Sequence, residues 1–174
     1  MLLSDGTGLS RFAKALAGLA ILGALAGCQV RPLYSTGSGT EGKLASVSIS
    51  EANDRVEQKV RNDLIFLLAG GAGEPQNAIY HLEMNVTVRN IGVLIDVADD
   101  IPRAGRIVVA ADYNLVKTDS GETLASGKRS SVALVDFPVQ EFAKLRAVRD
   151  AENRAARELA ELIRADVAAA LGRR

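Results

Sequence analysis

The sequence has 174 residues, of which 48% are hydrophobic, and its 21 Lys and Arg balance its 21 Asp and Glu to a formal net charge of zero at pH 7. Because sequence-independent binding of nucleic acid needs a strong excess of basic residues, this balance argues against a nucleic-acid partner. The single cysteine excludes an intramolecular disulfide, so the hydrophobic residues have to supply the core of one domain of ordinary size.

The first 28 residues have the organisation of a lipoprotein signal peptide. Arg11 and Lys14 precede the apolar run ALAGLAILGALA at residues 15–26, which is too short to span a bilayer. Small residues then lead to Cys28, as in a bacterial lipobox. This resemblance implies that residues 1–27 are removed and that Cys28 carries an S-diacylglycerol group and an N-acyl chain, which together anchor the protein stably to a membrane. A buried cysteine or an intermolecular disulfide would leave the charged and apolar segments unexplained.

The residues after Cys28 predict the location of the protein and a tether. The inner-membrane retention signal of such lipoproteins is Asp after the cysteine, and Gln29 stands there instead, which favours the outer membrane. Residues 35–43, STGSGTEGK, offer almost nothing to bury. We therefore interpret residues 28–43 as a lipidated N-terminus and flexible tether.

The folded domain is expected to begin with a short strand and a helix. Alternation of apolar residues with serines predicts a strand over residues 44–50. Asn53 or Asp54 can cap the helix that follows, with Glu57 in the capping-box position. Apolar residues recur there at helical spacing, and Gly70-Gly71 ends the helix.

Three strands are predicted next. Residues 78–88 alternate regularly, and a change of phase near Asn90-Ile91-Gly92 indicates a β-bulge or bend. The charged segment 96–106 contains a proline and a glycine and is expected to be a loop. Residues 107–116 form the next strand, and after a tight reversal residues 124–135 form the last.

A long helix is predicted from about Val139 or Phe142 to Leu171, with one apolar stripe and exposed ion pairs. The stripe consists of Leu145, Val148, Ala151, Ala155, Leu159, Leu162, Ile163, Val167 and Leu171. The whole pattern predicts an α+β two-layer sandwich in a single domain, residues 44–174. Its order is strand-helix-strand-strand-strand-helix, with a mainly antiparallel sheet and both helices on one face.

The sequence contains no recognisable catalytic constellation. His81 is the only histidine and lies on the polar phase of a strand, so we interpret it as a surface residue. Neither a nucleophile elbow nor a phosphate-binding loop is present. The aspartates Asp96, Asp99 and Asp100 could hold a divalent ion, but charges in a loop are usually only solvated. We therefore predict neither an enzyme nor a metal site.

Two basic residues are candidates for binding an anion. Arg103 and Arg106 flank Gly105 in the predicted loop, and two guanidinium groups in such a position can make bidentate contacts to phosphate. Local pairing with the nearby aspartates is an equally good interpretation of the same residues.

The chain resembles the LptE family of lipopolysaccharide-assembly lipoproteins, in its alphaproteobacterial form. The resemblance rests on the lipobox cysteine followed by R-P-L-Y at Arg31–Tyr34, the order of elements, the R-x-G at Arg103–Gly105, and the terminal LRAVRDAENRAARELAELIRADVAAAL. It implies a non-enzymatic outer-membrane lipoprotein that sits one-to-one as a plug inside the β-barrel of LptD, helps that barrel to fold, and takes part in delivering lipopolysaccharide to the outer leaflet.

The resemblance also implies which residues contact lipopolysaccharide. A basic residue of the family's R-x-G segment falls on Arg103, and a lysine near the start of the last helix falls on Lys144. Arg106 is the second arginine of the same segment, and Lys128 and Arg129 are additional candidates. Gln29-Val30 replaces the family's Gly-Trp or Gly-Phe after the cysteine.

One alternative function stays open. A periplasm-facing lipoprotein that serves as an adaptor or accessory subunit of another envelope lipid-transport complex would carry the same signal peptide and a similar domain. Location in the inner membrane would favour this alternative.

Overall fold

The computed structural model describes residues 39–96 and 101–173, so the predictions for the signal peptide, Cys28 and most of the tether lie outside the described residues. The described elements in chain order are α2 (Thr40–Leu44), β1 (Val47–Ile49), α3 (Arg55–Ala69), β2 (Tyr80–Asp96), β3 (Ile101–Lys117), β4 (Thr123–Asp136) and α4 (Glu141–Gly172).

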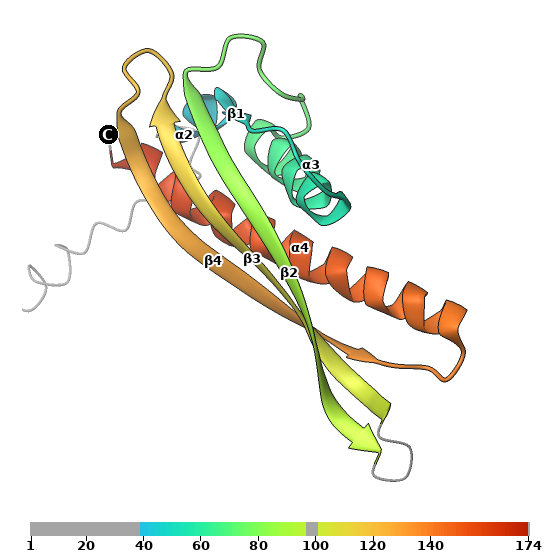
Figure 1. Ribbon diagram of the computed structural model, residues 1–174. Coiled ribbons are helices and arrows are strands. Elements are labelled where there is room, and N and C mark those ends of the chain that lie inside the picture. Colours follow the sequence, from blue (N-terminus) through green and yellow to red (C-terminus); the bar gives the residue numbers. More distant parts are fainter. Residues whose placement is uncertain (1–38, 97–100, 174) are drawn as a thin grey trace, which may run out of the picture. The chain divides into compact units, whose positions relative to one another are not determined.

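The structure confirms the predicted α+β sandwich. The four strands form one sheet in the order β1-β2-β3-β4, in which β1 pairs with β2 in parallel and the other pairs are antiparallel. Helices α3 and α4 lie on the same side of this sheet (Figure 1). We call the covered side the inner face and the other side the outer face.

Local capping signals set the bounds of α3. Asp54 has an extended backbone, and its side chain accepts hydrogen bonds from the amides of Val56 and Glu57 at 2.7 and 2.9 Å. Gly70 ends the helix in a left-handed conformation, with φ of 59°. Both features were predicted, because capping depends on neighbouring residues.

The folded part of the chain begins earlier than predicted. Helix α2 occupies residues that the sequence assigned to the tether, and Thr40 is buried. The Lys43 ammonium donates to the Leu171 carbonyl at 3.1 Å, which ties α2 to the C-terminal end of α4. The expected strand over residues 44–50 is correspondingly shorter, because Leu44 ends the helix.

The hairpin of β2 and β3 is longer than predicted. The segment 96–106 was expected to be a loop, and for residues 101–106 this is wrong, because β3 already begins at Ile101; residues 97–100 lie outside the described residues. The predicted irregularity in β2 is confirmed, with register shifts between Gly92 and Leu94 and between Leu94 and Ile95. Pro102 pairs with Ile95 beside the second shift. A bulge is one of the places where a strand tolerates proline.

The core lies between the inner face of the sheet and the two long helices. Fully buried residues of α4 include Leu159, Ile163, Val167 and Leu171, as the predicted stripe requires. Two members of that stripe are not in the core, because Leu145 is 56% exposed and Leu162 is 38% exposed. Among the described helices, none combines the length and the apolar character that crossing a bilayer requires.

Candidate functional site

Arg103 and Arg106 lie on strand β3 and not on a flexible loop. Gly105, Ile107 and Val109 alternate as buried residues of the inner face, so Arg103 belongs to the phase of that face and Arg106 to the phase of the outer face. Both side chains are exposed. The sequence had indicated that the two guanidinium groups bind one ligand. The structure instead places them on opposite faces of the sheet.

Arg103 lies instead beside the segment that joins β4 to α4. The amide of Phe137 donates to the Arg103 carbonyl at 2.9 Å, which extends the pairing of β3 and β4 past the end of β4. The Lys144 ammonium lies 5.8 Å from the centroid of the Phe137 ring, within range of a cation–π interaction. Phe137 thus contacts the backbone of Arg103 and the ammonium group of Lys144, the two residues that the family resemblance pointed to.

Gly105 makes this arrangement possible. A Cβ atom at this position would lie 2.6 and 2.8 Å from two carbons of the Phe137 ring and 2.9 Å from the Ile91 carbonyl oxygen. Only a glycine lets the ring approach β3 this closely. We call Arg103, Gly105, Phe137 and Lys144 the distal cluster, because the three that belong to β3 and the segment after β4 lie toward the end of the sheet away from β1.

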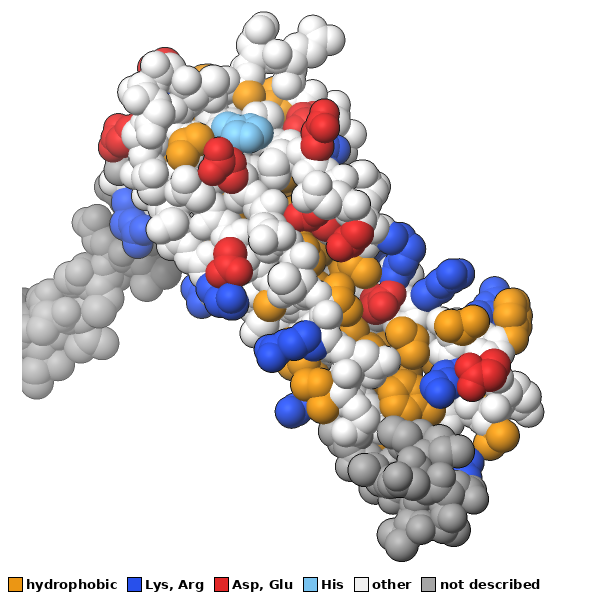
Figure 2. All heavy atoms as spheres, viewed as in Figure 1, with side chains coloured by type: hydrophobic (Ala, Val, Ile, Leu, Met, Phe, Trp, Pro, Cys, Tyr) orange, Lys and Arg blue, Asp and Glu red, His pale blue; other side chains and the backbone are white. Residues whose placement is uncertain are grey.

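The start of α4 adds an exposed apolar surface next to the distal cluster. Val139, Phe142 and Leu145 are 76%, 72% and 56% exposed. The Arg146 guanidinium lies 5.5 Å from the centroid of the Phe142 ring. Figure 2 shows orange and blue side chains side by side at this end of the molecule. Apolar and cationic groups together suit a ligand that is both acidic and fatty.

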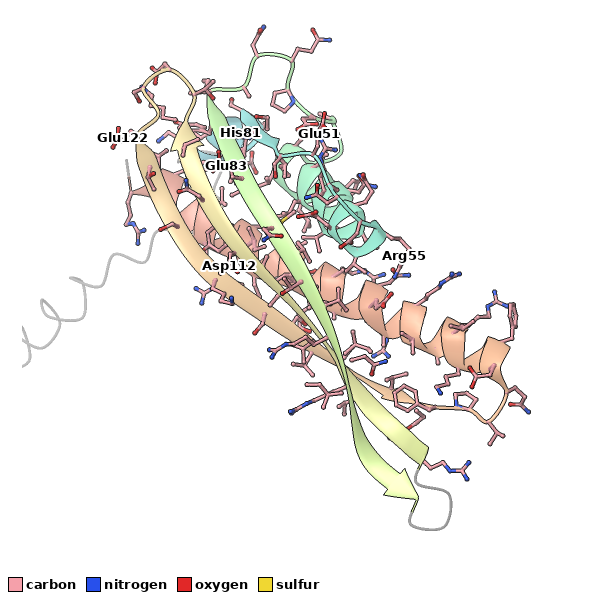
Figure 3. The ribbon with its side chains drawn as sticks, in the orientation of Figure 1. Glu51, Arg55, His81, Glu83, Asp112 and Glu122 are labelled. Atoms are coloured by element: carbon pink, nitrogen blue, oxygen red, sulfur yellow. The ribbon has the colours of Figure 1, made fainter. Side chains whose placement is uncertain are left out.

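The outer face has a different character in its two halves. Near β1 it is polar and slightly hollowed, and its side chains come from Glu83, Asn85, Asp112, Asn114 and Ser126. Figure 3 labels Glu83 and Asp112 along this half. Farther from β1, Arg106 pairs with Leu134 and Val108 pairs with Val132 across β3 and β4. Leu134 is 71% exposed and Val132 is 49% exposed.

Lys128 and Arg129 lie away from the distal cluster. Asp112 pairs with Lys128 at 3.0 Å, and both oxygens of Asp166 accept from Arg129 at 2.6 and 2.8 Å. The register places Arg129 opposite Ala111, whereas Arg106 is opposite Leu134. This is a separation of five residues along β3, or about 17 Å. Their predicted contact with lipopolysaccharide stays a prediction.

Arg129 and Asp166 also form a clamp with Tyr113. The Tyr113 hydroxyl donates to Asp166 at 2.6 Å. Burial, together with this hydrogen bond, raises the pKa of Tyr113 to about 12. The hydrogen bond from Arg129 holds the pKa of the Asp166 carboxyl below its ordinary value. The clamp fastens α4 to β3 and β4, which is a structural task.

The described residues contain no group of three or more His, Cys, Asp or Glu that could hold a metal ion. His81 has its Nδ1 atom 2.9 Å from the Ser48 hydroxyl, and no carboxylate completes a triad there among the hydrogen bonds of the described chain. Asp99 and Asp100 lie outside the described residues, and of Asp96 only the backbone at the end of β2 is described.

Reasoning from the sequence missed Phe137, Val139 and Phe142 as parts of the site. The phenylalanines follow a strand and begin a helix, positions at which an apolar residue is usually expected to be buried. One signal was available in the sequence, because the glycine of the R-x-G segment indicates that another group approaches the backbone closely there. The ring that approaches Gly105 comes from a residue more than thirty positions later in the chain.

Comparison with known proteins gives a family and a fold. The profile of the LptE family, described as lipopolysaccharide-assembly, matches residues 44–167. No curated protein matches the sequence. The crystal structure of a candidate lipoprotein from Caulobacter crescentus CB15 is similar, with a TM-score of 0.65 and 25% identity over 77% of this chain and 96% of that chain.

Two more distant crystal structures share the fold. Rare lipoprotein B from Shewanella oneidensis has a TM-score of 0.51 and 12% identity over 71% of this chain and 92% of that chain. A minor lipoprotein from Acinetobacter baumannii has a TM-score of 0.50 and 12% identity over 71% of this chain and 88% of that chain. Since the family profile spans well over half of the sequence, this chain belongs to the LptE lipopolysaccharide-assembly family.

Proposed function

We propose that the protein is an outer-membrane lipoprotein, anchored through lipid on Cys28, that plugs the β-barrel of LptD, assists its assembly, and takes part in passing lipopolysaccharide to the outer leaflet. The family match over residues 44–167 carries this proposal, because it identifies the process to which the chain contributes. It supplies no reason to expect an enzyme.

The two kinds of surface support a plug that also handles a lipid. A barrel lumen is polar, and the half of the outer face near β1 presents charged and amide side chains to match it. The Asp112–Lys128 pair on that face carries both signs of charge. A plug can turn this half of the outer face toward a water-filled lumen.

The distal cluster suits the acidic end of lipopolysaccharide. Its lipid A carries phosphates, and the cations Arg103 and Lys144 can replace the divalent ions that bridge phosphates of neighbouring molecules. The exposed Val139, Phe142 and Leu145 next to the cluster can contact acyl chains. Phe137 bonds the backbone that carries Arg103, and its ring lies beside the Lys144 ammonium, so we assign it a positioning role.

Co-purification tests the barrel partner. When the full-length lipoprotein is extracted from membranes in mild detergent, LptD should accompany it in a one-to-one complex. Recovery of the lipoprotein alone, or only from the inner membrane, would contradict the proposal and favour an adaptor of another lipid-transport complex.

Charge reversal tests the distal cluster. Lys144→Glu and Arg103→Glu should each weaken binding of lipopolysaccharide at least tenfold. Arg157→Glu is the matched control, because Arg157 is also exposed on α4 but lies about 20 Å along the helix from Lys144. Equal binding by all three variants would remove the cluster from the proposed site.

A further inference from the structure

Side chains cap several backbone groups at the two edges of the sheet. At the edge of β1, the Ile49 amide donates to the Glu74 carboxylate at 2.9 Å, and the Ser50 carbonyl accepts from Arg61 at 3.0 Å. At the edge of β4, the Leu134 carbonyl accepts from Arg154 at 2.9 Å. Occupied edge groups cannot pair with another chain, so these caps prevent unwanted strand addition.

The same device continues along β2 after β1 ends. The Met84 amide donates to the Ser50 hydroxyl at 3.1 Å, and the Val86 amide donates to the Glu57 carboxylate at 3.1 Å. Glu57 is only 2% exposed, and its other oxygen accepts from the Asn53 amide at 2.7 Å. A buried carboxylate is costly, and here it satisfies one backbone donor of β2 and one of the segment before α3.

The caps stop at Val86 although the strand does not. The two-residue period of a strand directs the amide and carbonyl groups of Val88 and Asn90 to the same edge as those of Met84 and Val86. In the described part of the chain, neither a strand nor a side-chain cap pairs with these two residues at this edge. Figure 1 shows β1 beside only the upper end of β2, whose lower half continues past it.

The side chains around this edge define what could pair with it. Arg89 is exposed on the outer face, next to the strand β3 that carries Arg106. On the inner face, Val86 is buried and Val88 is half-buried. A strand added at Val88 and Asn90 would place one set of its side chains beside Arg89, with Arg106 one strand farther away, and the other set beside Val88 and Asn90. Charge and apolar complementarity thus require alternating acidic and apolar residues in the incoming strand.

We propose that the edge of β2 at Val88 and Asn90 binds an extended segment of the LptD barrel by β-strand addition, and that this segment alternates acidic and apolar residues. This inference rests on the proposed function, because it takes LptD as the partner. Strand addition would contribute backbone hydrogen bonds to the contact between plug and barrel, in addition to the side-chain contacts of the polar outer face and the distal cluster.

The substitution Asn90→Pro tests strand addition at the edge of β2 without disturbing the sheet of the lipoprotein alone. Because the Asn90 amide points away from β3, Asn90→Pro removes an edge donor and leaves the β2–β3 ladder intact. Asn90→Ala is the matched control, since it removes the side chain and keeps the amide. We expect Asn90→Pro to lower the recovery of LptD in co-purification at least tenfold and Asn90→Ala to change it less than twofold, with equal thermal midpoints for the two free variants.

Hydrogen exchange gives a second measurement on the wild-type complex. Peptides that cover residues 86–92 should exchange at least tenfold more slowly in the LptD complex than in the free lipoprotein. Unchanged exchange, or full recovery of LptD with Asn90→Pro, would overturn the strand addition while leaving the plug function in place. A wild-type protein that recovers no LptD would overturn both. Protection of the same peptides in a homodimer of the free protein would reassign the edge to a second copy of this chain and also overturn the proposal.

Discussion

Gly105→Ala should disturb the distal cluster more than its single added methyl group suggests. The new Cβ would lie 2.6 Å from the Phe137 ring and 2.9 Å from the Ile91 carbonyl oxygen. The ring can move, but the carbonyl belongs to the paired strand β2 and cannot move without breaking the ladder. Overpacking of this kind costs about 1 to 3 kcal/mol of unfolding free energy. For a domain of this size, we expect the thermal midpoint to fall by about 4 to 12 °C.

A double-mutant cycle isolates the contribution of the ring. In a Phe137→Leu background the ring contacts are gone and only the carbonyl contact remains. Gly105→Ala should therefore cost less there, with a coupling of at least about 0.5 kcal/mol between the two positions. Urea denaturation followed by circular dichroism measures all four proteins.

The control substitution is Gly42→Ala. A Cβ at Gly42 meets nothing within 4 Å, and this glycine lies inside α2, so alanine should leave stability unchanged or increase it slightly. If Gly105→Ala were as stable as Gly42→Ala, or if its cost were the same with and without the Phe137 ring, the close packing described for the distal cluster would be wrong.

Three further predictions concern the buried polar groups. Glu57→Ala should lower the unfolding free energy by about 2 to 4 kcal/mol in urea denaturation, because it leaves the buried Val86 amide without an acceptor; a loss below about 0.5 kcal/mol would contradict this role. Asp166 has a pKa held below its ordinary value of 3.8, first by the hydrogen bond from Arg129, so its contribution to stability is present above that value and is lost as the pH falls toward the lower folded-state pKa. As the pH falls from 5 into the acid range, the unfolding free energy of Asp166→Asn should therefore decrease less than that of the wild type. An equal decrease would count against the clamp. Tyr113 has a pKa raised to about 12, so its stabilising effect should be present below its ordinary value of 10 and fade as the pH rises through 12; the near-ultraviolet difference between the wild type and Tyr113→Phe should then titrate near pH 12, and a midpoint at 10 would contradict the burial of this hydroxyl.

The sequence predicted those parts of the fold whose causes are local. The N-cap at Asp54 and the terminator at Gly70 depend on a few neighbouring residues, and the structure confirms both. The start of β3 depends on pairing with β2, which the local sequence does not reveal. The charges and Pro102 therefore made this segment resemble a loop. Pairing across the hairpin overrides these local preferences, and the bulge in β2 accommodates the proline.

In the candidate site, the sequence pointed to the cations and not to the aromatic residues. Family resemblance pointed to Arg103 and Lys144, but nothing local shows that both residues lie beside Phe137. Phe137 links them through its amide on one side and its ring on the other. Contacts of this kind depend on the close approach permitted by Gly105, which is a tertiary property.

Arg103 and Arg106 lie on opposite faces of β3, so we expect them to have different functions, although the sequence had suggested that both bind lipopolysaccharide. Arg103 belongs to the distal cluster, whereas Arg106 lies on the outer face near Arg89 and the open edge of β2. Charge reversal at the two positions should therefore have different effects. Arg103→Glu should weaken lipopolysaccharide binding and leave recovery of LptD nearly unchanged, whereas Arg106→Glu should lower recovery of LptD and leave lipopolysaccharide binding nearly unchanged. If both variants lost lipopolysaccharide binding equally, the two arginines would act on one ligand in spite of the sheet between them.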